Sequence, residues 1–189
     1  MAHTAPAGTT GHTASGDWAA DPAASTISFT VANFGVRKVT GTMPLTSATV
    51  TIAPDGRPVG IRAEIDAGGI DTANRRRDSD LRGRRFLDTG TWPAISFTAG
   101  HIEPVGAGWV VDGTLRVKDR ACPVRLDVAG PVSMPGGPRS PAELRASGQV
   151  DRRSAGVTAG PAFLVGHQVS IALTVCLRPP ATGPEVIPG

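Results

Sequence analysis

Hydrophobic and polar residues alternate along most of this chain in short runs that are separated by turns. The clearest run covers residues 26–31, in which Ile27, Phe29 and Val31 fall on one face and three hydroxyl residues fall on the other. A period of two residues is that of a β-strand with one buried face. Comparable runs predict further strands at 36–43, 47–53, 60–66, 94–100, 109–117, 123–129, 144–150 and 168–177.

Turn residues separate these runs. The chain has 24 glycines and 17 prolines in 189 residues, and the segments 54–58 and 106–108 are typical hairpin turns. Short antiparallel strands with one apolar face must close on themselves or pair as a sandwich. About eight strands enclose a side-chain core or one apolar ligand. We predict a single all-β domain at 17–178, an antiparallel eight-stranded barrel, with disordered tails at 1–16 and 179–189.

The segment 72–87 breaks the strand pattern. Asp71 or Thr72 can cap the start of a helix, and Gly83 interrupts the run. We therefore expect one or two short helical turns across one mouth of the barrel, with Phe86 and Leu87 closing the mouth. A second insertion, at 151–166, is expected to be a loop.

The first insertion carries a cluster of arginines, and Asp78 and Asp80 partly offset its positive charge. Four interpretations stay open: a solvated face with local Arg–Asp pairs, a rim that holds a phosphate or pyrophosphate head group, contact with an anionic membrane, and nucleic acid. The cluster lacks the interleaved aromatic residues that stack on bases, so no nucleic-acid partner is expected. The arginines are Arg75, Arg76, Arg77, Arg82, Arg84 and Arg85.

The residues that usually carry catalysis or bind metals are sparse. The four histidines do not have metal-ligand spacing with a cysteine or a carboxylate. Neither a G-x-S-x-G motif, a P-loop nor a dinucleotide fingerprint occurs, and tyrosine is absent. Cys122 and Cys176 do not form a disulfide framework. We expect no catalytic residue, no metal and no cofactor, and therefore not an enzyme.

The N-terminal residues lack the basic and apolar regions of a secretory signal, and no run approaches the roughly 20 apolar residues of a membrane span. From this we expect a cytoplasmic protein with reduced cysteines.

The order of short motifs from about Trp18 to Leu177 resembles the YceI-like family. The densest part of the resemblance is the insertion, followed by the strand after it. The residues that carry it are Asp21-Pro22-x-x-Ser25-x-Ile27-x-Phe29, Arg77-Asp78-x-x-Leu81-Arg82-x-x-x-Phe86-Leu87-Asp88, Trp92-Pro93-x-Ile95-x-Phe97, Gly113-x-Leu115-x-Val117 and Pro123-Val124-x-Leu126.

The chain departs from the family at Ala24, Asn33 and Asp80, where histidines are common, and at Gly83, where serine is usual. These departures concern residues that could bind the polar head group of a ligand, whereas the residues of the apolar pocket are unaffected.

The resemblance implies a lipocalin-like barrel that binds a polyisoprenoid or prenylquinone-like lipid for sequestration or transport, and it leaves a homodimer open. Two alternatives remain: an enzyme acting on a small apolar or quinone-like substrate in the same barrel, and a ligandless structural or stress-response module whose side chains fill the lumen. The expected rim residues are Arg77, Asp78, Arg82 and Arg85. The expected lumen residues are Ile27, Phe29, Ile65, Leu81, Phe86, Phe97, Leu115, Leu126, Ile171 and Leu173.

Overall fold

The computed structural model describes residues 15–33, 37–133, 140–159 and 165–180. Within these residues the chain forms ten strands, one α-helix and one short 3-10 helix. In chain order they are β1 (Gly16–Ala20), η1 (Pro22–Ala24), β2 (Thr26–Asn33), β3 (Arg37–Met43), β4 (Leu45–Ile52), β5 (Pro58–Asp66), α1 (Arg75–Arg82), β6 (Ala94–Val105), β7 (Gly108–Val117), β8 (Arg120–Ser133), β9 (Ala142–Asp151) and β10 (Val165–Arg178).

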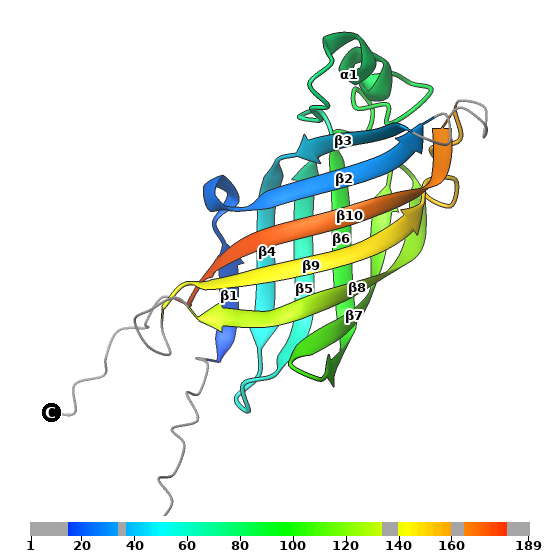
Figure 1. Ribbon diagram of the computed structural model, residues 1–189. Helices are drawn as coiled ribbons and strands as arrows, with labels where there is room; N and C mark the ends of the chain where they lie inside the picture. The colour runs from blue at the N-terminus through cyan, green and yellow to red at the C-terminus, as the bar shows by residue number, and fades with distance from the viewer. Residues whose placement is uncertain (1–14, 34–36, 134–139, 160–164, 181–189) are drawn as a thin grey trace, which may run out of the picture.

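The strands form a closed antiparallel barrel (Figure 1). Eight strands make the ring, in the order β1-β4-β5-β6-β7-β8-β9-β10, and β1 closes it by pairing with β10. The hairpin of β2 and β3 extends this wall beyond the ring along β10. Because only η1 separates β1 from β2 and only Pro44 separates β3 from β4, these four strands are two long strands that bend. The predicted eight-stranded barrel is confirmed.

All nine predicted strands are present, and β1 is the strand that the pattern missed. Its sequence, GDWAA, holds one large apolar residue, so it shows no alternation. Gly16, which was expected in the tail, begins this strand. β8 continues to Ser133, beyond the predicted end of this strand at residue 129. Of the other expected tail residues, Ser15, Pro179 and Pro180 belong to no helix or strand, and 1–14 and 181–189 lie outside the described residues.

Hydrogen bonds around η1 extend the seam, the line along which β1 and β10 pair and close the barrel. The Asp21 backbone N–H donates to the Cys176 carbonyl over 2.8 Å. The Ser25 hydroxyl donates to the Asp21 carbonyl over 2.7 Å and accepts from the Cys176 N–H over 3.1 Å. The chain therefore stays bonded to β10 while it changes from β1 to β2.

The helix α1 stands at the end of the barrel next to β3 (Figure 1). Its N-cap is Asn74, whose side chain accepts from the Arg77 N–H over 3.0 Å, and not Asp71 or Thr72 as the sequence suggested. Both of those residues are engaged elsewhere: Asp71 pairs with Thr42 of β3, and Thr72 binds Asp78. The predicted length of one or two turns is correct, and Gly83 ends the helix.

The seam gives the first prediction. Trp18 is only 3% exposed and packs with Val50 and Leu177 where the barrel closes. Trp18→Ala should lower the free energy of unfolding by about 3–5 kcal/mol, because it removes a large side chain and leaves a cavity. Trp92, which is 39% exposed, is the matched control, and Trp92→Ala should cost about 1 kcal/mol or less. Equilibrium urea unfolding measures the free energy of unfolding of both variants. An equal loss in the two variants would show that packing of Trp18 at the seam does not stabilise the barrel more than an exposed tryptophan does.

Candidate functional site

The barrel encloses a cavity of about 1170 Å³. Every described strand and α1 contribute to its wall, and nearly all of the lining side chains are apolar. Most ligand pockets measure roughly 300–1000 Å³, so this volume exceeds what a small polar metabolite needs. The polar lining residues are Ser28, Asn74, Arg76, Arg77, Asp80 and Arg152.

All ten apolar residues that the sequence placed in the lumen line this cavity; their contact with a ligand stays a prediction. Several further lining residues were missed, among them Trp18, Ile61, Trp109 and Val111. Ile61 shares its strand face with Ile65, and Val111 shares its face with Leu115, so the period of two was a signal that could have found them.

Two lumen phenylalanines lie flat across glycines on neighbouring strands. A Cβ atom added at Gly41 would lie 2.5 Å from Cζ of Phe29, and one added at Gly113 would overlap the ring of Phe97. Because glycine has no side chain, each ring packs against the barrel wall.

The cavity opens at the α1 end of the barrel. The lining residues that are themselves exposed are Ala32, near the end of β2, and Asn74, Arg76 and Asp80 on the insertion. Towards the other end the wall is apolar and includes Pro58 and Trp109, beside the β4–β5 and β6–β7 hairpins (Figure 1). The lumen is therefore polarised, with charged groups at its mouth and an apolar interior.

A buried network around Thr72 holds the insertion in place. Asp78 is 5% exposed and accepts from the Thr72 N–H over 3.0 Å and from the Thr72 hydroxyl over 2.5 Å. Arg77 donates to the Thr72 hydroxyl over 2.7 Å and to its carbonyl over 2.8 Å. The hydrogen bond from the hydroxyl lowers the pKa of Asp78 below its ordinary value of 3.8, against the opposing effect of desolvation. Arg77 and Asp78 are thus linked through Thr72, to which both side chains are hydrogen-bonded.

The predicted rim residues have different surroundings. Arg77 lines the cavity. Arg82 donates to the carbonyls of Gly68 and Ile70, both over 2.7 Å, so it braces the segment before α1, and Asp78 is buried in the network. Arg85 is exposed and, like Asp78 and Arg82, is not part of the cavity wall. Of the four, only Arg77 is placed to meet a ligand in the cavity.

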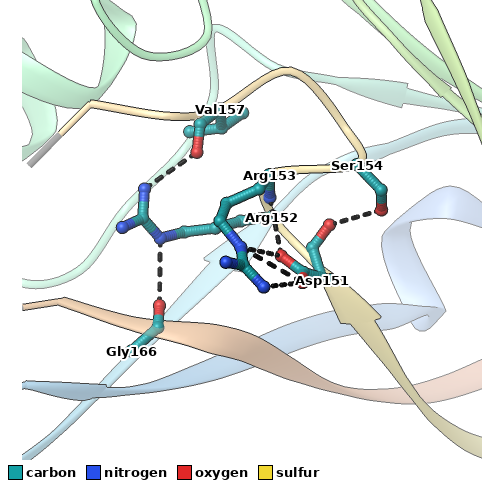
Figure 2. Close-up of polar contacts among 6 residues, drawn as sticks. All are labelled: Asp151, Arg152, Arg153, Ser154, Val157 and Gly166. Atoms are coloured by element: carbon teal, nitrogen blue, oxygen red, sulfur yellow. Dashed lines mark hydrogen bonds and ion pairs between the residues drawn. The ribbon is translucent and has the colours of Figure 1, made fainter. Parts of the chain in front are cut away.

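Arg152 is a lining residue for which the sequence carried no signal, because it falls in the segment expected to be a loop. It is 6% exposed, and it donates from Nε to the Gly166 carbonyl over 2.9 Å and from Nη1 to the Val157 carbonyl over 2.8 Å (Figure 2). Nη1 also donates to the Ala159 carbonyl over 2.8 Å. Arg152 is absent from the lumen residues expected from the sequence, although it lines the cavity. It anchors the turn after β9 to the start of β10.

Its neighbour Arg153 lies on the other side of the chain and pairs with Asp151 (Figure 2). Arg153 Nη2 lies 2.6 Å from Asp151 Oδ2, and this bond is the main reason that the pKa of Asp151 falls to about 2. Two consecutive arginines therefore differ: one pairs with an outer carboxylate, and the other lies buried beside the lumen.

The described residues include no group of three or more histidines, cysteines, aspartates and glutamates that could hold a metal ion. Cys122 is buried and donates to the Leu115 carbonyl over 3.4 Å, and burial raises the pKa of its thiol, which disfavours the nucleophilic thiolate. None of the helices in the described residues is long and apolar enough to cross a bilayer.

Comparison with known proteins gives one family and a consistent fold. The model of the YceI-like domain matches residues 18–177. A UPF0312 protein of Yersinia enterocolitica is 29% identical over 120 residues; this alignment covers 61% of the chain and 60% of the relative's length.

Among solved structures, Burkholderia cenocepacia BcnA superposes with a TM-score of 0.73 at 21% identity, covering 86% of this chain and 99% of BcnA. A polyisoprenoid binding domain from Saccharophagus degradans, implicated in plant cell wall breakdown, gives a TM-score of 0.62 at 15% identity, covering 86% of this chain and 98% of that domain. At these identities the two structures establish the fold.

The Thr72 network predicts a pH dependence. Because the pKa of Asp78 is lower in the folded state, its contribution to stability is complete above the ordinary carboxyl pKa and is lost as the pH falls through the lowered value. Asp78→Asn should therefore lower the melting temperature at pH 7, and its difference from the wild type should shrink below about pH 4. Asp80→Asn, at an exposed position on the same helix, is the control. A difference that does not change with pH would exclude this role of the Asp78 carboxylate.

Proposed function

The chain belongs to the YceI-like family, and we propose that its barrel binds a long polyisoprenoid or prenylquinone-like lipid for sequestration or transport. The observation that carries the proposal is the enclosed apolar cavity of about 1170 Å³. The similarity of fold to a domain described as polyisoprenoid binding supports the same ligand class.

The physical basis of binding is the transfer of an apolar chain out of water. Each CH₂ group that is buried gains about 0.8 kcal/mol, so a long tail provides affinity without specific contacts. The mouth supplies the polar groups that orient the ligand, from Asn74, Arg76, Arg77 and Asp80.

The two alternatives fit less well. A ligandless module needs side chains that fill the lumen, whereas Phe29 and Phe97 lie against the wall and leave a large cavity. An enzyme needs an acid, base or nucleophile beside the substrate. The charged lining residues are three arginines, which stay protonated, and Asp80, which is exposed at the mouth. We therefore favour a binding protein.

We also propose that the open end contacts an anionic membrane. Arg75, Arg76, Arg84 and Arg85 are exposed on the insertion, and Trp92 is exposed in the segment that follows it. Basic residues near an anionic bilayer contribute about 1 kcal/mol each, and tryptophan is favoured at the interface. In this proposal the mouth of the lumen faces the membrane. A homodimer stays a prediction from the sequence.

Ligand binding can be tested by tryptophan fluorescence, because Trp18 and Trp109 line the cavity whereas Trp92 does not. A prenylquinone that enters the lumen should quench part of the emission and saturate near one ligand per chain. Ala63→Phe should weaken binding about tenfold or more, since Ala63 lines the cavity and the added ring occupies it. Arg62→Phe, on the outer face of the same strand, should leave binding unchanged. If the wild-type protein shows no saturable quenching, and no lipid is extracted from protein purified from its own host, the function is wrong.

Membrane contact can be tested separately by co-sedimentation with phosphatidylglycerol-containing vesicles. The double substitution Arg84→Gln and Arg85→Gln should reduce binding by roughly tenfold or more at low salt. The same change of charge at Arg57 and Arg62, which are exposed on β5 or next to it, should have little effect. Equal losses in both variants would show that only net charge matters.

A further inference from the structure

We propose that Trp109 is a specificity-determining residue that limits the length of the apolar tail that the lumen accepts. The proposal deepens the lipid-binding function and rests on it. It assigns the upper limit of tail length to one side chain, at the end of the lumen farthest from the mouth.

Trp109 lies at the end of the barrel away from α1. It lines the cavity, and it pairs with Pro104 just after the β6–β7 hairpin (Figure 1). From there β7 runs to Val117, which also lines the cavity. The adjacent Lys118 donates to the Phe86 carbonyl of the insertion over 2.8 Å, so Val117 lies at the mouth end. A tail that enters at the mouth therefore reaches Trp109 last.

Large side chains elsewhere in the lumen lie against the wall because a glycine faces them. Phe29 pairs directly with Gly41, and Leu126 pairs directly with Gly148. A Cβ atom added at these glycines would lie 2.5 Å from Phe29 Cζ and 2.7 Å from Leu126 Cδ2. The middle of the lumen therefore stays wide although its residues are large.

Trp109 has no such place on the wall. Its direct partners on the neighbouring strands are Pro104 and Val128, which both carry side chains. Gly130 is its diagonal neighbour on β8. A Cβ atom added at Gly130 would lie 2.5 Å from the Ala107 carbonyl oxygen, and no atom of Trp109 lies within 4 Å of that position. Because the hairpin itself occupies this part of the wall, the indole projects into the end of the lumen.

The backbone that carries Trp109 is closely packed. Val105 pairs with Gly108 across a two-residue turn, in which Gly106 has a φ of 58°. Turns of this kind fix the register of a hairpin. A Cβ atom added at Gly108 would overlap the Val128 carbonyl oxygen, so β7 and β8 approach each other closely beside the indole. A tail that reaches Trp109 thus meets a side chain on a well-supported strand.

The length of β7 gives the expected limit. From Trp109 to Val117 the strand advances about 26 Å, at roughly 3.3 Å per residue. A strand tilt of about 40° reduces this to about 20 Å along the barrel axis. An extended chain advances about 1.2 Å per main-chain bond. About 16 bonds, the length of about four isoprene units, should therefore reach from the mouth to Trp109.

The experiment uses ubiquinone homologues, which share one head group and differ only in the number of isoprene units. Binding is followed by quenching of tryptophan emission, since Trp18 also lines the cavity and is retained in every variant. In the wild-type protein each added unit should tighten binding about tenfold or more, up to about four units. Longer homologues should bind no more tightly, because the additional units find no apolar wall to cover them.

The variants test whether Trp109 sets this limit. Trp109→Ala should move the limit by about one isoprene unit to longer tails, since the indole no longer fills the end of the lumen, and should leave the short homologues unchanged. Trp109→Phe should move it less, because a smaller ring remains. Trp92→Ala is the matched control, since Trp92 is exposed and is not part of the cavity wall, and it should leave the limit in place.

The position of the limit separates length selection from a purely structural role. If Trp109 only stabilises the hairpin, its removal weakens all homologues by the same factor, and an unmoved limit in Trp109→Ala overturns the proposal. Binding that continues to tighten through the longest homologue in the wild-type protein overturns it without any variant, even if Trp109→Ala does not fold.

The two proposals fail in different ways. Saturable binding of the homologues without a limit on tail length would overturn the role of Trp109 and leave the lipid-binding function standing. Binding of none of the homologues by the wild-type protein would overturn both.

Discussion

The closure of the sheet between β1 and β10 is the constraint on which the rest of the structure depends. The direct pairing is short, Ala19 with Arg178 and Ala20 with Leu177, and η1 continues the contact along β10. Once the ring is closed, every second side chain of each strand faces an interior that water cannot fill favourably. The same closure pairs the two edges of the eight-stranded ring with each other, whereas β3 stays at the edge of the sheet, paired with β2. The lumen, its apolar wall and its single polar end all follow from this geometry.

The insertion gives the barrel its asymmetry. Thr72, Asp78 and Arg77 form a buried network, and the Thr42–Asp71 bridge ties the preceding segment to β3, so α1 stays at one end. The arginine cluster is therefore not one functional unit. Arg77 and Arg82 mainly hold the insertion together, whereas Arg75, Arg84 and Arg85 are exposed around the mouth. This division separates the arginines that hold the insertion in place from those that stay exposed to solvent.

The lining of the lumen has two chemically different parts. It is apolar over nearly all of the wall, and its charged residues lie on the insertion and in the turn after β9. Arg76 and Asp80 are lining residues that are also exposed. Arg152, in the turn after β9, adds a buried cation to the lining.

The sequence by itself determined the strands, their inward faces and the barrel. The alternation of residues such as Ile27, Phe29 and Ile171 with a period of two can be seen within each segment, and in a closed sheet the apolar face of each strand must point inward. It also determined the position of the insertion. It could not give β1, whose five residues show no alternation, nor the N-cap at Asn74, since the more obvious caps Asp71 and Thr72 are taken by partners elsewhere. Only the tertiary structure separated Arg152 from Arg153. Which of two adjacent arginines is buried depends on the carbonyls of Val157, Ala159 and Gly166, and the sequence does not state where the fold will bring those carbonyls.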